Sequence, residues 1–145
     1  MDLNNGKVKS IFNEELDRER QFYFLSVSPS TKLVFYIDKN HKTALKDLQN
    51  ESVKSFPSKI IKANQLAGNF LWSPDETKLV FMIEDLDKEY NYSSADYFIL
   101  NVETGDTKTF LKDQKEYLFV TNINNDSITL SNQERYSLFD GSKIK

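Results

Sequence analysis

The sequence contains no cysteine, which excludes disulfide bonds and thiolate-ligated metal sites. It contains a single histidine, His41, so a zinc site would have to rely on carboxylates and a Ser–His–Asp triad could use only this histidine. No Gly-x-Ser-x-Gly motif accompanies it. The preceding residues Asp38–Asn40 are typical of a hairpin loop, so we interpret His41 as a solvated loop residue. The sequence therefore argues against nucleophilic catalysis, and it predicts no catalytic residue and no cofactor.

The chain also has no basic excess and no long apolar run. With 19 basic and 22 acidic residues its net charge is −3, so nucleic acid is disfavoured as a partner. No segment approaches the roughly 18 apolar residues that a membrane span requires. Met1–Gly6 does not resemble a signal peptide, so we expect either a cytoplasmic protein or one whose leader has been removed. In 145 residues, 13% of them aromatic, one domain of packed strands is expected.

One stretch, Asn69–Glu84, has the pattern of an apolar strand, a tight turn and a second apolar strand, and it recurs earlier in the chain. Ser28 and Ser73, each followed by proline, match at an offset of 45 residues. Thr31–Phe35 and Thr77–Phe81 match at an offset of 46, which predicts one extra residue in the second turn. This repetition indicates an internal structural repeat.

The match continues beyond this hairpin. Asp47–Phe56 aligns with Asn101–Phe110 at an offset of 54, so the second unit should hold eight more residues, within Glu84–Tyr97. Each unit is predicted to contain four short strands. The predicted strands are Tyr23–Ser28, Lys32–Asp38, Thr43–Leu48 and Val53–Phe56 in the first unit, and Asn69–Ser73, Lys78–Glu84, Asp96–Val102 and Thr107–Phe110 in the second.

A third, decayed unit follows the two complete ones. Its predicted strands are Tyr117–Ile123, Ser127–Ser131, Arg135–Phe139 and a fourth that begins at Lys143. Lys7–Phe12 resembles the last strand of a unit and is interpreted as a lone strand of a preceding one. We therefore predict a single domain over residues 1–145, with units at roughly 22–56, 69–110 and 117–145.

Four-stranded units spaced by about 45 residues are typical of β-propeller blades. The segment Trp72–Asp75 followed by Lys78–Phe81 resembles the repeat of TolB-like propellers (the WD40-like, PD40 repeat), and about two complete repeats are covered. The turn Asn101–Asp106 is similar to that family's turn between the third and fourth strands. In the first two units Glu76 replaces the usual glycine and Ser30 replaces the aspartate, and the third unit has lost the Ser-Pro pair altogether.

The resemblance implies an all-β fold of four-stranded antiparallel blades. It also implies a non-enzymatic scaffold for protein or ligand binding, and an extracytoplasmic location. The family includes the accessory propellers of some serine peptidases, so a propeller portion of a hydrolase whose catalytic domain is absent here is the alternative. A structural self-assembly module is the third interpretation.

Closure of a ring raises a separate question, because propellers have about 4–8 blades. Three arrangements are compatible with this number: the chain is an excerpt of a longer propeller, two copies complete one ring, or the fold is an open array. Lys7–Phe12 could supply the strand that the third unit lacks beyond Lys143. Because uncovered blade faces and strand edges are rare in soluble proteins, we predict a protein partner or a homodimer.

The insertion in the second unit is the best candidate for a site. Its acidic and amide residues have the spacing of a calcium loop, although Tyr90 stands where that loop needs glycine. The weak metal candidates are Asp85, Asp87, Glu89, Asn91 and Asp96. The interpretation that we favour is a solvated acidic hairpin loop without metal, in which Tyr90 and Tyr92 are candidate anchors for a partner.

The only tryptophan, Trp72, lies just before the second Ser-Pro turn. A binding role is one interpretation of this residue, but its place beside Phe70 and before an apolar strand favours packing between blades. We therefore expect Trp72 to be buried.

Overall fold

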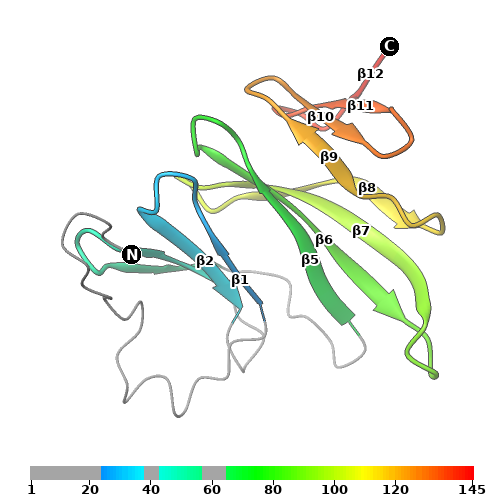
Figure 1. The fold of residues 1–145 in the computed structure, drawn as a ribbon, viewed down its shortest axis with the longest axis horizontal. Coiled ribbons are helices and arrows are strands. Elements are labelled where there is room, and N and C mark those ends of the chain that lie inside the picture. Colours follow the sequence, from blue (N-terminus) through cyan, green and yellow to red (C-terminus); the bar gives the residue numbers. More distant parts are fainter. Residues whose placement is uncertain (1–23, 38–42, 57–64) are drawn as a thin grey trace.

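The computed structural model describes residues 24–37, 43–56 and 65–145, and in these ranges every regular element is a β-strand. The strands form three antiparallel sheets of four strands each, here called blades 1, 2 and 3, and each sheet follows chain order (Figure 1). The predicted all-β fold with four-stranded antiparallel units is therefore confirmed. No helix that could span a membrane occurs in these ranges.

Most strands lie where the sequence predicts them. Blade 1 comprises β1 (Phe24–Val27), β2 (Leu33–Ile37), β3 (Thr43–Asp47) and β4 (Val53–Ser55). Blade 2 comprises β5 (Gln65–Trp72), β6 (Lys78–Leu86), β7 (Tyr92–Asn101) and β8 (Thr107–Gln114). Blade 3 comprises β9 (Val120–Ile123), β10 (Ser127–Leu130), β11 (Arg135–Ser137) and β12 (Lys143–Ile144). The main difference is that β5 and β7 begin four residues earlier than predicted.

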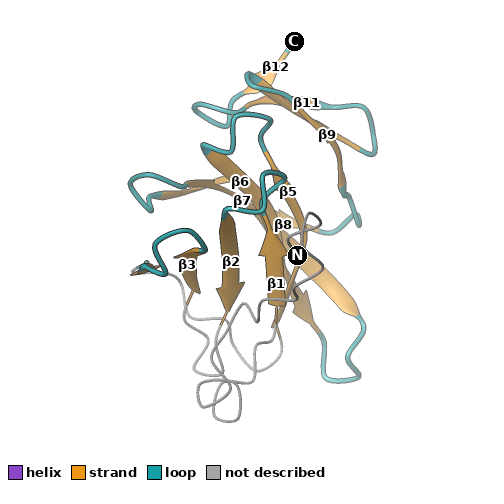
Figure 2. Cartoon of the chain, turned by 60° about the vertical axis from the view of Figure 1, so that its left-hand side comes forward, coloured by secondary structure: helices purple, strands orange, loops and turns teal. Residues whose placement is uncertain are grey.

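The three blades lie face to face in chain order, and Figure 2 shows blade 2 between the other two. The first strands of the blades are neighbours, since β5 contacts both β1 and β9. The described residues therefore place their apolar side chains in one layer on each side of blade 2 and in a smaller cluster, of Val34, Tyr36, Ala44 and Leu48, on the opposite face of blade 1. This explains why the β2 and β6 strands are apolar at consecutive positions, because both faces of these strands are covered.

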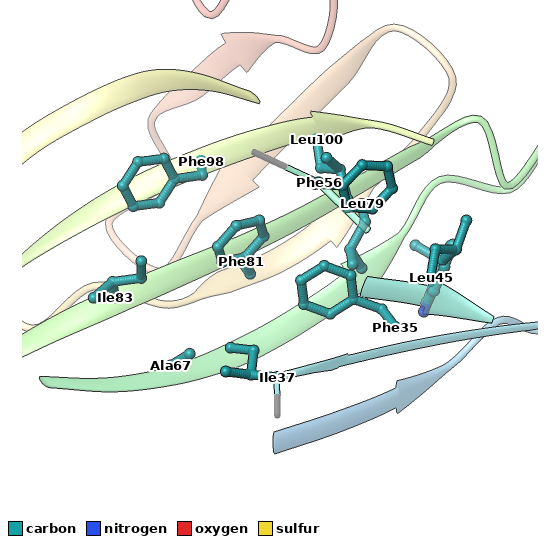
Figure 3. Close-up of a cluster of buried hydrophobic side chains, with 11 residues drawn as sticks. Phe35, Ile37, Leu45, Phe56, Ala67, Leu79, Phe81, Ile83, Phe98 and Leu100 are labelled. Carbon is teal, nitrogen blue, oxygen red and sulfur yellow. The ribbon is translucent and has the colours of Figure 1, made fainter. Parts of the chain in front are cut away.

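The layer between blades 1 and 2 is built around aromatic rings (Figure 3). Phe81 of β6 lies between Phe35 of β2 and Phe98 of β7, with ring centroids 5.6 and 5.4 Å apart. Trp72 joins this layer and is 8% exposed, which confirms the predicted packing role. Its indole Nε1 donates a hydrogen bond of 2.9 Å to Oγ of Ser26 in blade 1, so the polar end of the ring is satisfied as well.

The layer between blades 2 and 3 is aliphatic at its centre. Its buried members are Val80, Met82, Ala95, Tyr97, Ile99, Leu118, Val120, Ile128, Leu130, Tyr136 and Leu138. The Tyr97 hydroxyl is buried here and donates to the main-chain carbonyl of Leu118. Desolvation therefore raises the pKa of Tyr97 far above its ordinary value.

The first turns of blades 1 and 2 have the same length, which corrects the predicted extra residue. Ser28 N–H donates to Leu33 O and Ser73 N–H donates to Lys78 O, both at 2.9 Å. The structural offset is therefore 45 residues throughout this hairpin. At this offset Phe35 and Val80 occupy equivalent positions, and each faces the next blade. An offset of 46 would instead equate residues that lie on opposite faces of the strand. The later match at 54 holds, so the β6–β7 hairpin is nine residues longer than its counterpart.

The turn between the third and fourth strands is the best-repeated feature. Its first side chain caps the turn in all three blades, since Asp47, Asn101 and Ser137 each accept hydrogen bonds from the main-chain N–H groups two and three residues later. Four residues further on, the backbone adopts a left-handed conformation, with φ of 59° at Glu51, 80° at Gly105 and 69° at Gly141. The three blades therefore share one geometry at this turn.

The outer face of blade 3 differs from the corresponding faces of the other blades. Phe35 and Leu45 face blade 2, and Val80 and Ile99 face blade 3. At the same place in blade 3 the paired residues are Thr129 and Arg135. Blade 3 also has its own short fourth strand, β12, paired with β11. Lys7–Phe12, the strand expected to complete it, lies outside the described residues.

Candidate functional site: an aromatic surface beside the long hairpin

The nine extra residues of blade 2 lengthen the β6–β7 hairpin and leave only a short loop. β6 continues to Leu86, which pairs with Tyr92 at the start of β7. The loop between them is capped by Asp87, whose Oδ1 accepts hydrogen bonds from the N–H groups of Glu89 (2.8 Å) and Asn91 (2.9 Å). The hydrogen bond from Asn91, together with that from Glu89, holds the pKa of Asp87 below its ordinary value. Most of the predicted loop is therefore regular strand.

The weak metal candidates of this hairpin are engaged in different contacts. Asp85 lies on β6 and accepts a 2.6 Å hydrogen bond from Nε2 of Gln65. Asp96 is buried on β7, and its Oδ1 accepts a 2.8 Å hydrogen bond from the N–H of Asp113. Within residues 24–37, 43–56 and 65–145, no group of three or more acidic or histidine side chains could hold a metal ion. His41 lies outside the described residues.

The two tyrosines that the sequence singles out have different environments. Tyr90 is at the tip of the loop, is 76% exposed and has a left-handed backbone with φ of 63°. Tyr92 is half-buried, and its hydroxyl donates a 2.7 Å hydrogen bond to the carbonyl of Gln114 at the end of β8. Desolvation, with a further contribution from the Glu84 charge, raises the pKa of Tyr92. Tyr92 is therefore anchored, whereas Tyr90 projects into solvent.

Tyr92 continues into a set of apolar side chains that the sequence does not single out. Its ring meets Tyr117 edge to face at 5.0 Å, and the Tyr117 ring lies 6.5 Å from that of Phe119. Tyr117 is 49% exposed and Phe119 is 47% exposed. Leu66, which is 44% exposed, pairs with Glu84, whose Oε1 accepts a 3.2 Å hydrogen bond from the Tyr117 hydroxyl. We call Leu66, Tyr92, Tyr117 and Phe119 the aromatic surface.

The alternation along residues 117–120 is the signal that could have revealed this surface. Leu118 and Val120 are buried against blade 2, so Tyr117 and Phe119 alternate with them and remain accessible. The sequence pattern predicts the whole run as strand, and it does not reveal which alternate residues lack a neighbour that covers them. Tyr92 is the one predicted anchor that belongs to the aromatic surface.

The charges beside the aromatic surface are mainly negative. Four carboxylates, of Glu84, Asp85, Asp87 and Glu89, occur within six consecutive residues, with Lys88 as the only basic residue among them. Desolvation and the neighbouring Glu84 charge raise the pKa of Tyr117, so its hydroxyl remains protonated and donates its hydrogen bond. The site is thus apolar and aromatic at its centre, with an acidic hairpin at its side. Such a site suits a binding role.

The structure is similar to known β-propeller proteins. TolB from Acinetobacter baumannii matches 87% of this chain with a TM-score of 0.53 and 13% identity. Dipeptidyl peptidase 4 from Porphyromonas gingivalis matches 80% of it (TM-score 0.55, 13% identity), and oligogalacturonate lyase from Vibrio parahaemolyticus matches 83% (TM-score 0.57, 13% identity). The chain spans 32%, 22% and 38% of those proteins, respectively. No family model and no curated protein matches the sequence. At this identity the similarity assigns the propeller fold and no activity.

Proposed function

We propose that this chain, whose three sheets have the fold of β-propeller blades, is a non-enzymatic scaffold that binds a protein segment through the aromatic surface. The observation that carries the proposal is the pair Tyr117 and Phe119, two large rings that are each about half exposed. Contiguous exposed apolar side chains on a soluble protein commonly mark an interaction site.

The aromatic surface is held in place before any partner binds. Tyr92 donates to the Gln114 carbonyl and Tyr117 donates to Glu84, so both tyrosine hydroxyls have partners inside the chain. A ring that is already ordered loses little conformational entropy on binding, which favours affinity. Phe119 and Leu66 then offer uncommitted apolar area beside these fixed rings.

The acidic hairpin indicates what kind of segment would bind. Its carboxylates would attract basic residues, while the rings would contact an apolar side chain and could also receive a cation over their faces. We therefore infer a partner segment that carries an aromatic or aliphatic residue flanked by lysine or arginine. The TolB-like resemblance of the blade motifs supports a binding role, because that family includes binding scaffolds.

A peptide selection tests this proposal. A phage-displayed random peptide library selected on the protein should yield peptides that combine apolar and basic residues. Their affinity should fall about tenfold or more in Phe119→Ser, as expected for a central apolar contact. Val53→Ser is the matched control, because Val53 is 49% exposed on β4 and far along the fold from the surface. Peptides that bind wild type and Phe119→Ser equally would contradict the proposal.

Self-association is the second partner that the sequence suggests, and it stays a prediction. Its motive in the sequence is the lack of a neighbouring blade at each end, but Val34 and Tyr36 on the outer face of blade 1 are buried, and the outer face of blade 3 presents Thr129 and Arg135 rather than apolar side chains. Packing between blades of the kind seen in this chain is therefore not expected on that face. A dimer that formed through the aromatic surface instead would compete with the selected peptides and would be lost in Phe119→Ser.

A further inference from the structure

Two equivalent contacts join adjacent blades near their fourth strands, one between blades 1 and 2 and one between blades 2 and 3. In the first copy of this contact, side chains of the protein occupy the space between the blades. Between blades 1 and 2, Leu33 at the start of β2 packs against the buried core. Nζ of Lys54 on β4 donates to the main-chain carbonyl of Glu103 in the facing turn of blade 2, and it lies 5.8 Å from the centre of the Phe56 ring. The cation of this copy is therefore committed to a partner within the chain.

The second copy, between blades 2 and 3, contains a cavity. At the 45-residue structural offset Lys78 takes the position of Leu33, so an ammonium group replaces an isobutyl group. At the 54-residue offset Lys108 takes the position of Lys54. Phe139 takes the position of Glu103, because it lies two residues after the turn-capping Ser137 as Glu103 lies two residues after Asn101. The cavity has a volume of about 200 Å³, and Ile99, Leu138 and Phe139 form its apolar wall.

The charged groups around this cavity leave two cations available. Lys78 and Lys108 line it, and within the described part of the chain neither ammonium group makes a hydrogen bond or an ion pair. Asp106 also lines the cavity. Asp140 lies close enough for the Lys108 charge to act on it, but its carboxylate accepts hydrogen bonds from the N–H and hydroxyl of Ser142.

We propose that this cavity binds a small carboxylate with an apolar body, either a free organic acid or the C-terminal residue of a peptide. The carboxylate would lie between the ammonium groups of Lys78 and Lys108, and the apolar body would contact Ile99, Leu138 and Phe139. Asn101 also lines the cavity, and because its Oδ1 accepts from the N–H groups of Glu103 and Thr104, its amide nitrogen is the group that could donate to a ligand. Charge-assisted hydrogen bonds to two cations give selectivity for the ionised acid.

The cavity and the aromatic surface lie at opposite ends of blade 2. The Lys78–Asn101 pair marks one end of the β6–β7 ladder, and the Leu86–Tyr92 pair marks the other. Either site can therefore fail without the other, and the two proposals are tested by different variants.

The test compares matched ligands by titration of amide resonances in NMR spectra. N-acetyl-phenylalanine should shift the resonances around the cavity with a Kd on the order of 1 mM, whereas its neutral amide should bind at least about tenfold more weakly. A tetrapeptide that ends in phenylalanine distinguishes the two sources, because tighter binding than the free acid favours a peptide C-terminus and equal binding favours a free acid.

Two variants give the test its control. Lys78→Leu restores the residue found in the first copy, so it should fold and should lose binding of the acid. Lys54→Met removes the cation that occupies the position of Lys108 in the first copy and is already bonded within the chain, so it should leave binding unchanged. Equal binding of acid and amide, undiminished binding by Lys78→Leu, or no saturable shift up to about 20 mM would each overturn the proposal.

Discussion

Replacing Ser30 by aspartate should destabilise the contact between the first turns of blades 1 and 2. Both oxygens of the Glu76 carboxylate are used there, one by the N–H of Ser30 and the other by its hydroxyl at 2.6 Å. Desolvation opposes ionisation of Glu76, but the hydrogen bonds from Ser30 outweigh it and hold the pKa of Glu76 below its ordinary value. These are the two positions at which the first-turn motifs of blades 1 and 2 depart from the TolB-like repeat. The two residues that depart from the repeat, Ser30 and Glu76, are therefore hydrogen-bond partners of each other.

The expected magnitude follows from the geometry. An aspartate at position 30 would place a second carboxylate beside Glu76 and remove the hydroxyl donor. Two like charges about 4 Å apart repel by about 1 kcal/mol in water and about 4 kcal/mol at an effective dielectric constant of 20, and this exposed site lies near the lower limit. Loss of the donor adds about 1 kcal/mol. We therefore expect Ser30→Asp to lower the free energy of unfolding by about 2 kcal/mol.

The double variant isolates the interaction. Glu76 has a left-handed backbone with φ of 57°, so Glu76→Gly removes the opposing charge and relieves backbone strain at the same time. Ser30→Asp should then cost nearly nothing in the Glu76→Gly background, which gives a coupling energy of about 1–2 kcal/mol. Thr31→Gly is the control, because Thr31 has the same conformation, with φ of 59°, at the equivalent place in blade 1.

Urea denaturation of the four variants at pH 7 measures this coupling. The charge component should shrink in 1 M salt, where exposed charges are screened, while the strain component should not. A coupling energy below about 0.3 kcal/mol would refute the argument, since independent sites add within that limit. The departures from the repeat would then be unrelated substitutions.

Four further predictions concern stability, pH, metal and association. Gly105→Ala should lower the free energy of unfolding by about 2–4 kcal/mol, because φ is +80° and a Cβ would lie 2.2 Å from the ring of Phe56. Gly68→Ala is the control: its Cβ would meet nothing closer than 3.9 Å, so urea denaturation should show a loss under about 1 kcal/mol. Hydrogen bonding by the Ser137 side chain, then by Ser142, lowers the pKa of Asp140 to about 2, so its contribution to stability is present above the ordinary value of 3.8 and is lost as pH falls toward 2. The stability difference between wild type and Asp140→Asn should shrink over that window. Calcium should not raise the melting temperature, and a rise abolished by Asp85→Ala with Asp87→Ala would contradict this expectation. Light scattering should detect a homodimer, and a clean monomer near 16.9 kDa would contradict the dimer.

The architecture could be predicted from sequence because its signals are local. The turns at Ser28 and Ser73 and the caps at Asp47 and Asn101 depend on nearby residues, and each appears in the structure as a repeated turn. The register within the first hairpin could not be predicted in the same way. The β2 and β6 strands are apolar on both faces, so a shift of one residue leaves the pattern apolar and gives no warning.

The sites depend on contacts between distant segments, and this limited what the sequence could reveal. Tyr92 was accessible to prediction because it lies in an obvious insertion. Its contact with Tyr117 is a meeting of the β6–β7 hairpin with the segment before β9, which no local pattern encodes. The cavity beside Lys78 is harder still to predict. Its clue is the replacement of an apolar residue, Leu33, by Lys78 at the equivalent position, and the sequence match at an offset of 46 hides this replacement because it aligns Lys78 with Lys32.

The residues that face the next blade change in a way that the repeated turns do not. The paired positions are Phe35 and Leu45 in blade 1, Val80 and Ile99 in blade 2, and Thr129 and Arg135 in blade 3. The repeated turns preserve the fold of each blade. The fold alone does not explain why the outer face of blade 3 has lost the apolar side chains that the other two blades carry there. Burying Thr129 and Arg135 against an apolar neighbour would leave the Thr129 hydroxyl and the remaining Arg135 donors without partners, since only Nη2 of Arg135 donates within the blade, to Oγ of Ser127. The cost is about 1–3 kcal/mol for each neutral group and more for the charged guanidinium. Any contact that this face makes must therefore supply hydrogen bonds or an opposite charge. A homodimer that closes a ring through blade 3 should accordingly weaken in high salt, whereas one formed through the aromatic surface should strengthen.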